Sequence, residues 1–68
     1  MSEKLAKRIG RNLRKLRMAR ELTIDQLADP NDLSRGYISE LENGKKLPSL
    51  PMLERIAAAL KVDIKELF

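Results

Sequence analysis

The feature that most constrains the fold is a pair of short helical patterns in residues 23–44, which only five residues separate. The first pattern begins at TIDQ, residues 23–26, where a threonine and a glutamine three positions later form a capping box. Pro30 ends it early, because the residue before a proline is displaced from the helical region. The second covers residues 34–42, with a serine as N-cap and an Asn-Gly pair as its stop signal. Two helices so short and so closely joined predict a helix-turn-helix unit.

Three further helices are expected around this unit. A helix over residues 3–20 precedes it, with an apolar face made of Leu5, Ile9, Leu13 and Leu16. Gly10 lies inside that helix, where glycine is tolerable if a neighbour packs close to it. A fourth helix follows Pro51 and has its apolar face at Leu53, Ile56, Ala57 and Leu60, and a fifth opens at a second capping box in residues 63–66. The expected fold is all-α, a compact bundle of five short helices in a single domain, residues 1–68.

The composition excludes several classes of function. The 68 residues include no cysteine and no histidine, which removes disulfides, thiolate ligands, and the commonest metal ligand and general base. The remaining serine, lysine and carboxylate residues do not cluster as a nucleophile with its base, so we expect no enzyme, no metal and no cofactor. No apolar run approaches the length of a membrane span and no secretory signal is present, so a cytoplasmic protein is the default expectation. No feature indicates a small-molecule ligand.

The net charge of +4 is unevenly distributed along the chain. Residues 1–20 carry eight basic residues against one acidic residue, whereas residues 21–42 carry one basic against six acidic residues. Residues 43–68 carry five basic against three acidic residues. A basic N-terminal segment suggests a polyanion or an anionic surface as partner, and the acidic middle argues against indiscriminate binding through every face.

The stretch LTIDQLADPNDLSRGYISELENGK resembles the lambda-repressor-like helix-turn-helix family, also called Cro-type or XRE-type. The resemblance extends over roughly residues 9–67 and needs no insertion or deletion between residues 23 and 44. The matching positions are Leu22, Thr23, Leu27, Ala28, Leu33, Ser34, Ile38, Ser39, Glu42, Gly44, Pro48, Ser49, Ala57, Leu60 and Val62. The short chain is further similar to stand-alone controller-type regulators, which are small homodimers. The resemblance implies a DNA-binding transcription regulator.

Two positions depart from the family pattern. The family's glutamine at the start of the second helix helps to hold the DNA backbone, but here the residue is Ile24, so that contact is not carried over. The family's turn glycine is replaced by Asp32. Aspartate tolerates the left-handed backbone that this turn needs better than most residues other than glycine, so we expect the turn to persist with some strain.

The resemblance implies that residues 34–42 form the recognition helix, which enters the major groove of DNA and reads base edges. The base-reading positions are Ser34, Arg35, Gly36, Ser39 and Glu40. Arg35 is the foremost candidate, because arginine makes a bidentate pair with guanine, although it can instead contact a phosphate or solvent. Ser39 can bond a base or a phosphate, and Glu40 can accept from cytosine, face solvent or pair with Arg35. Gly36 has no side chain and offers either a close backbone approach or a merely tolerated glycine.

Phosphate contacts are expected on both sides of the recognition helix. The candidates are Tyr37, Asn43, Lys45, Lys46, Arg11 and Arg14, with Arg8 as a further possibility. The alternative for Tyr37 is a partly buried ring at the helix junction. A row of charges on one helix face is usually solvated surface, but together these residues would supply salt-sensitive affinity that is independent of sequence.

Two further groups of residues have structural roles by resemblance. Arg17 and Glu42 match a family pair, which predicts a partly buried salt bridge that orients the recognition helix rather than adding net stability. The apolar residues beyond the motif are candidates for a dimer interface: Leu60, Val62, Ile64, Leu67 and Phe68. The alternative is that they close the core, which is the stronger reading for Leu60 and Ile64.

These observations together favour a sequence-specific, double-stranded-DNA-binding transcriptional regulator that acts as a homodimer on an inverted-repeat operator. One alternative is the antitoxin of a toxin pair, which would bind DNA through the same motif. Another is an interaction or membrane-surface module that uses the basic first helix. Against the second alternative, the apolar face of that helix is needed by the other helices, and the helix has no aromatic residue to anchor it in a membrane.

Overall fold

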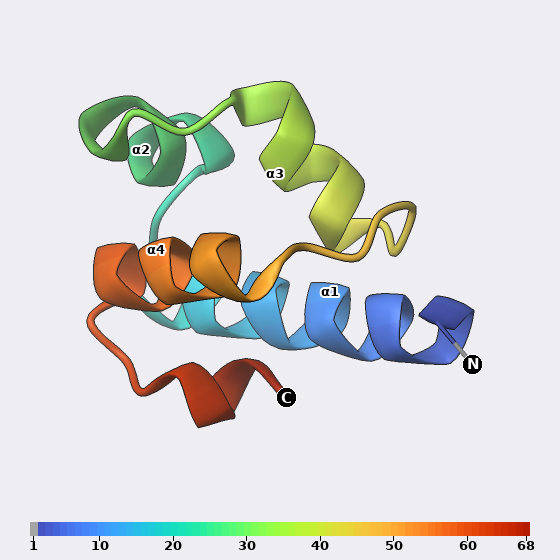
Figure 1. The fold of residues 1–68 in the computed structure, drawn as a ribbon. Coiled ribbons are helices and arrows are strands. Elements are labelled where there is room, and N and C mark those ends of the chain that lie inside the picture. The colour runs from blue at the N-terminus through green and yellow to red at the C-terminus, as the bar shows by residue number, and fades with distance from the viewer. Residues whose placement is uncertain (1) are drawn as a thin grey trace.

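The computed structural model describes the backbone of residues 2–68 and the side chains of residues 4–68, and every regular element in that range is helical. The elements are α1 (Ser2–Ala19), α2 (Ile24–Ala28), the 3₁₀ turn η1 (Asp29–Asn31), α3 (Arg35–Glu42), α4 (Leu50–Leu60) and the 3₁₀ turn η2 (Ile64–Leu67). Figure 1 shows α1 running along the lower half of the molecule, α2 and α3 above it, α4 crossing in front and the C-terminal turn below. None of the helices in this described range combines the length and apolar character that a membrane span requires.

The apolar stripe of α1 faces the centre of the molecule, as predicted. Ile9 and Leu13 are buried, and Leu5 and Leu16 are half-buried against the same core. The remaining core side chains come from every other helix and from the C-terminal turn: Leu27, Ala28, Leu33, Ile38, Leu41, Leu53, Ile56, Ala57, Leu60 and Leu67. One apolar cluster therefore joins the four α-helices and η2, and it holds the two helices of the helix-turn-helix unit against α1 and α4.

Helix α2 begins as predicted but ends for a different reason. The Thr23 hydroxyl accepts from the Gln26 N–H at 3.0 Å, and the Gln26 side chain accepts from the Thr23 N–H at 2.8 Å, which completes the capping box. The expectation that Pro30 displaces the preceding residue from the helical region is wrong, because Asp29 keeps helical angles (φ −61°, ψ −50°). The chain instead tightens into η1, where Pro30 occupies a first-turn position that needs no N–H donor.

The turn between α2 and α3 contains the predicted left-handed residue. Asp32 has φ 55° and ψ 41°, so aspartate occupies a conformation that usually favours glycine. Ser34 then caps α3, its hydroxyl accepting from the Tyr37 N–H at 3.2 Å. The direction in which α3 leaves the turn is therefore set by local hydrogen bonds.

The C-terminal end of α3 is closed by a Schellman motif. Lys45 N–H donates to the Glu40 carbonyl at 3.0 Å, and Gly44 N–H donates to the Leu41 carbonyl at 3.1 Å. Gly44 has φ +71°, which residues with a side chain rarely adopt. The helix therefore ends abruptly, and the chain turns toward α4 (Figure 1).

The predicted fifth α-helix is a 3₁₀ turn. Its capping box is present, because the Asp63 side chain accepts backbone N–H bonds and Glu66 reaches back to the Asp63 N–H. Four residues form i→i+3 bonds rather than an α-helix, which is the usual length of a 3₁₀ segment. The Asn12 side chain donates to the Leu67 carbonyl at 3.1 Å and so ties this turn to α1.

Candidate nucleic-acid interface

Helix α3 has one buried face and one outward face. Ile38 and Leu41 point into the core and are essentially inaccessible to solvent. Ser34, Arg35 and Gly36, at the start of the helix, are exposed. An amphipathic helix that buries one face in the core exposes its opposite face to solvent. The first turn of α3 therefore lies on the surface of the protein. A second macromolecule therefore has free access to this turn.

Arg35 is held by two carboxylates that the sequence analysis did not single out. Its Nη1 lies 3.4 Å from the Asp25 Oδ2, and its Nε lies 3.4 Å from the Asp29 Oδ1. The side chains of Arg35, Asp25 and Asp29 are 61%, 61% and 59% exposed, so these contacts remain in water. The alternative pairing of Arg35 with Glu40 does not occur.

Glu40 instead pairs with a predicted phosphate-binding residue. Lys46 Nζ lies 3.2 Å from the Glu40 Oε1 and 5.8 Å from the centroid of the Tyr37 ring. Glu40 and Ser39 are half-buried, as is the Tyr37 ring, which packs against the core. Lys46 and Glu40 thus offset each other's charge. The Lys46 ammonium group also lies over the face of the Tyr37 ring, at a distance that allows a cation–π contact.

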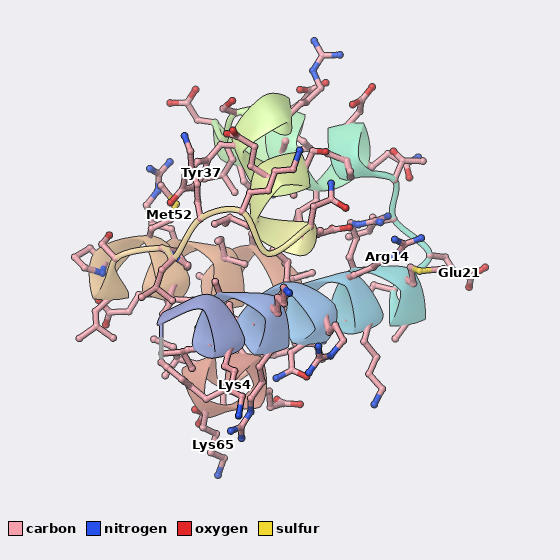
Figure 2. The ribbon with its side chains drawn as sticks, turned by 90° about the vertical axis from the view of Figure 1, so that its right-hand side faces the viewer. Lys4, Arg14, Glu21, Tyr37, Met52 and Lys65 are labelled. Carbon is pink, nitrogen blue, oxygen red and sulfur yellow. The ribbon has the colours of Figure 1, made fainter. Side chains whose placement is uncertain are left out.

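The other expected phosphate contacts are spread around α3. Asn43 and Lys45 are exposed at its end, where the Asn43 side chain donates to the Ser39 carbonyl at 2.9 Å. In Figure 2, Arg14 lies on the same side of the molecule as Glu21, opposite to Tyr37. Basic side chains therefore stand on both flanks of α3, because Lys46 lies over the Tyr37 ring on the opposite flank.

Arg11 lies in a different setting from Arg14, although both are exposed on α1. It lines a surface hollow of about 480 Å³ together with Lys4, Leu5, Lys7 and Arg8. The hollow thus gathers four basic residues of α1, and Arg14 lies outside its lining.

The ion pair expected between Arg17 and Glu42 is present and largely shielded from water. Nε and Nη2 of Arg17 donate to the two carboxylate oxygens of Glu42 at 2.6 and 3.0 Å, and the side chains are 11% and 5% exposed. The hydrogen bond to Glu42 raises the pKa of the Arg17 guanidinium above its usual value, although burial opposes the rise. Arg17 Nη1 also donates to the Leu22 carbonyl at 2.5 Å. One side chain of α1 therefore joins the end of α3 to the segment that leads into α2.

Two glycines bring α1 and α3 into close contact beside this pair. A Cβ on Gly10 would lie 2.2 Å from the Leu41 carbonyl oxygen and 2.9 Å from that of Glu42. A Cβ on Gly44 would lie 2.7 Å from Lys7 Cγ. The condition for a tolerable glycine at position 10 is therefore met, and the close neighbour is the backbone of α3.

A further arginine, missed in the sequence, supports the turn itself. Arg55 Nη2, from α4, donates to the Asp32 carbonyl at 3.1 Å and to the Asn31 carbonyl at 3.5 Å. No local pattern reveals this contact, because it joins two segments that are more than 20 positions apart. The residue that departs from the family pattern at the start of α2, Ile24, is half-buried against the core and has no donor for a phosphate.

The proposed dimer residues divide into two groups. Leu60 and Leu67 are 0% exposed, so assigning these two residues to an interface is wrong: they complete the core of the single chain. Val62 and Ile64 are half-buried against that core, and Phe68 is 39% exposed. Only the last three have surface available for a partner.

Comparisons with known proteins agree with this geometry. The family model described as a helix-turn-helix domain matches residues 8–67. The control protein C.MunI from a Mycoplasma species is 44% identical over 62 residues, which cover 90% of this chain and 84% of that protein. Several other curated relatives are longer, and the chain spans 39–50% of their length.

Two solved controller proteins share the fold. The restriction-modification controller protein C.AhdI from Aeromonas hydrophila matches with a TM-score of 0.87 at 35% identity, over 93% of this chain and 96% of that one. The controller protein C.Esp1396I, solved as a tetramer in complex with its natural 35 base-pair operator, matches with a TM-score of 0.81 at 28% identity, over 93% of each chain. The chain belongs to the XRE or lambda-repressor-like helix-turn-helix family of DNA-binding transcription regulators.

Proposed function

We propose that residues 1–68 act as a single helix-turn-helix domain that binds double-stranded DNA sequence-specifically and regulates transcription, with α3 in the major groove. The observation that carries the proposal is the placement of Arg35. It stands exposed in the first turn of a helix whose other face is buried and whose C-terminal end is tied to α1 by Arg17 and Glu42. A reading side chain needs a rigid base, and α3 supplies one.

The mechanism follows from the chemistry of the outward face. Arg35 would donate two parallel hydrogen bonds to O6 and N7 of a guanine, and Ser34, Ser39 and Glu40 offer further polar contacts to base edges. The backbone at Gly36 can approach DNA closely, because a Cβ there would have only the Ser34 hydroxyl within 4 Å, at 3.9 Å. Specificity would thus rest mainly on Arg35.

Affinity would come from basic residues on the two flanks of α3. Lys45, Lys46 and the Asn43 side chain lie beyond its C-terminal end, and Arg14 lies on the other flank (Figure 2). Contacts from these residues to phosphates release counterions, which makes binding fall steeply with salt. Arg11, which is exposed on α1 one turn before Arg14, is a further candidate.

We further propose that the protein acts as a homodimer on an inverted repeat. Two-fold symmetry would place two α3 helices about 34–36 Å apart, which is one turn of DNA. Val62, Ile64 and Phe68 form the candidate contact surface, since Leu60 and Leu67 are enclosed in the core. The multimeric assembly of C.Esp1396I on its operator supports this arrangement.

Selection of bound duplexes from a random pool tests the proposal. The recovered sequences should contain two symmetric half-sites with centres about 10 base pairs apart. Arg35→Ala should lower the preference for the recovered duplex over random DNA by about 5- to 150-fold, the range for one bidentate arginine–guanine pair. Lys65→Ala removes the same charge at the opposite end of the molecule from α3 (Figure 2) and should leave the preference unchanged. An Arg35→Ala protein with full selectivity would overturn the proposal.

A further inference from the structure

We propose that Asp25 and Asp29 are specificity-determining residues, which position the Arg35 guanidinium and repel phosphate groups from it. This inference rests on the proposed function, because it assumes that Arg35 reads DNA. Both carboxylates belong to the first half of the helix-turn-helix unit, Asp25 on α2 and Asp29 on η1. Both reach across to the first residue of α3.

The contacts leave part of the guanidinium free. Nη1 donates a hydrogen bond to the Asp25 Oδ2, whereas the Asp29 Oδ1 lies at ion-pair distance from Nε, so the two carboxylates contact different edges of the group. Among residues 4–68, Nη2 of Arg35 has no hydrogen-bond acceptor in the structure. A guanidinium carries five N–H donors, so those of Nη2 and one of Nη1 remain available for a guanine. The arginine can therefore be held and can read a base at the same time.

The local charge distinguishes a base from a phosphate. One arginine between two carboxylates has a summed charge of −1, and the side chains are all exposed to the same approaching partner. A phosphate carries a full negative charge and is repelled by such a group, whereas the O6 and N7 edge of guanine is neutral. Asp25 and Asp29 would thus suppress a phosphate contact by Arg35 without blocking the reading of guanine.

Asp25 and Asp29 both lie in segments whose backbone is held by hydrogen bonds. Asp25 lies in the first turn of α2, behind the capping box of Thr23 and Gln26. Asp29 precedes the turn that Arg55 holds through the Asp32 carbonyl. The backbone is therefore fixed at both aspartates, while their exposed side chains can still adjust to DNA at little energetic cost.

A purely structural role makes a different prediction. Asp25 could serve only to complement the positive end of the α2 dipole, and Asp29 could serve only the first turn of η1. Removing these charges would then lower stability slightly and leave DNA selectivity unchanged. Our proposal predicts the reverse, a large change in selectivity with little change in unfolding.

The test uses Asp25→Asn, Asp29→Asn and the double variant, with Glu54→Gln as the matched control. Glu54 is exposed on α4, and its substitution removes one negative charge without touching Arg35. The probes are a duplex recovered by the wild-type protein from a random pool and a scrambled duplex of the same composition. The double variant should bind the scrambled duplex about 10-fold more tightly, with a salt slope steeper by about 1, because Arg35 gains a phosphate. The affinity for the recovered duplex should change by less than about 3-fold, so the preference falls.

The same substitutions in an Arg35→Ala background show whether the carboxylates act through Arg35. In that background, the double variant should change the affinity for both duplexes by the same factor. The change in the logarithm of the affinity should be twice that produced by Glu54→Gln, because two charges are removed instead of one. Equal tightening on both duplexes in the wild-type background would overturn this inference and leave the proposed function intact. A wild-type protein that recovers no common sequence from the pool would instead overturn the proposed function itself.

Discussion

The two ends of α3 each carry an arginine–carboxylate contact, and the two contacts differ in every physical respect. At the C-terminal end, Arg17 and Glu42 meet at 2.6 and 3.0 Å and are almost fully enclosed. At the N-terminal end, Arg35 lies 3.4 Å from each of its carboxylates and is 61% exposed. The enclosed pair cannot open without stranding a charge, whereas the exposed contacts can rearrange freely. One end of the helix is thus fixed in place, and the other can rearrange at little energetic cost.

This contrast indicates how a domain of 68 residues can hold the proposed recognition helix in place. The enclosed end of α3 combines the ion pair with the close approach of its carbonyls to Gly10 and with the Schellman motif at Gly44. The exposed end has its Ser34 cap, water-exposed ion pairs and the exposed contact of Arg55 with the preceding turn. Stability and the proposed recognition of DNA would therefore depend on opposite ends of one short helix, so a mutation at either end should affect mainly one property.

The largest expected effect comes from breaking the enclosed pair. Arg17→Ala would leave the Glu42 carboxylate, which is 5% exposed, without its partner. Removing one member of a buried pair costs about 3 to 5 kcal/mol, because the other charge remains desolvated. Urea unfolding should therefore show a free energy of unfolding lowered by about 3 kcal/mol. The control is Arg35→Ala, which removes only water-exposed contacts and should cost under about 1 kcal/mol. Equal losses in the two variants would contradict the contrast between the two ends.

A smaller effect on stability is expected from replacing one glycine near each end of α3 by alanine. Gly10 of α1 contacts the C-terminal end of α3, and Gly36 lies in its first turn. Gly10→Ala places a Cβ against the backbone carbonyls of α3, which cannot move aside as a side chain would. Overpacking of this kind lowers the free energy of unfolding by about 1 to 3 kcal/mol. Gly36→Ala meets only the Ser34 hydroxyl at 3.9 Å, so the folded protein should gain up to about 1 kcal/mol from improved helix propensity.

Thermal or urea unfolding of the Gly10→Ala and Gly36→Ala variants tests these two expectations directly. If Gly10→Ala is as stable as the wild-type protein, then α1 and α3 are not in close contact, and the rigid end of the helix lacks its main support. If Gly36→Ala is strongly destabilised, the first turn of α3 is not the open surface that the structure describes.

Much of this arrangement is predictable from local sequence signals. The capping boxes at Thr23 and Asp63 follow from short patterns whose chemistry is local. The left-handed conformation of Asp32 is predictable only because the resembling family has a glycine at that position. The pair of Arg17 and Glu42 is predictable only through the family resemblance, because its partners are 25 positions apart.

The features that the sequence does not predict depend on how the helices cross. The contacts of Arg35 with Asp25 and Asp29 require α2 and α3 to meet at a particular angle, which no spacing rule specifies. The assignment of Leu67 to the core rather than to an interface depends on where the C-terminal turn folds back, since an apolar residue suits either place. Similarly, a capping box marks where a helix begins but does not distinguish an α-helix from a 3₁₀ turn.

The central claim is that Arg35 reads a base through its forked donors rather than attracting DNA through its charge. Arg35→Lys keeps the charge and removes the fork, so it separates the two possibilities. The measurement is the ratio of the dissociation constant for the scrambled duplex to that for the recovered duplex, taken across a range of salt concentrations. We predict that Arg35→Lys lowers this ratio by about 5- to 150-fold while affinity for the scrambled duplex and its salt slope stay unchanged. A variant that retains the full ratio would contradict the account.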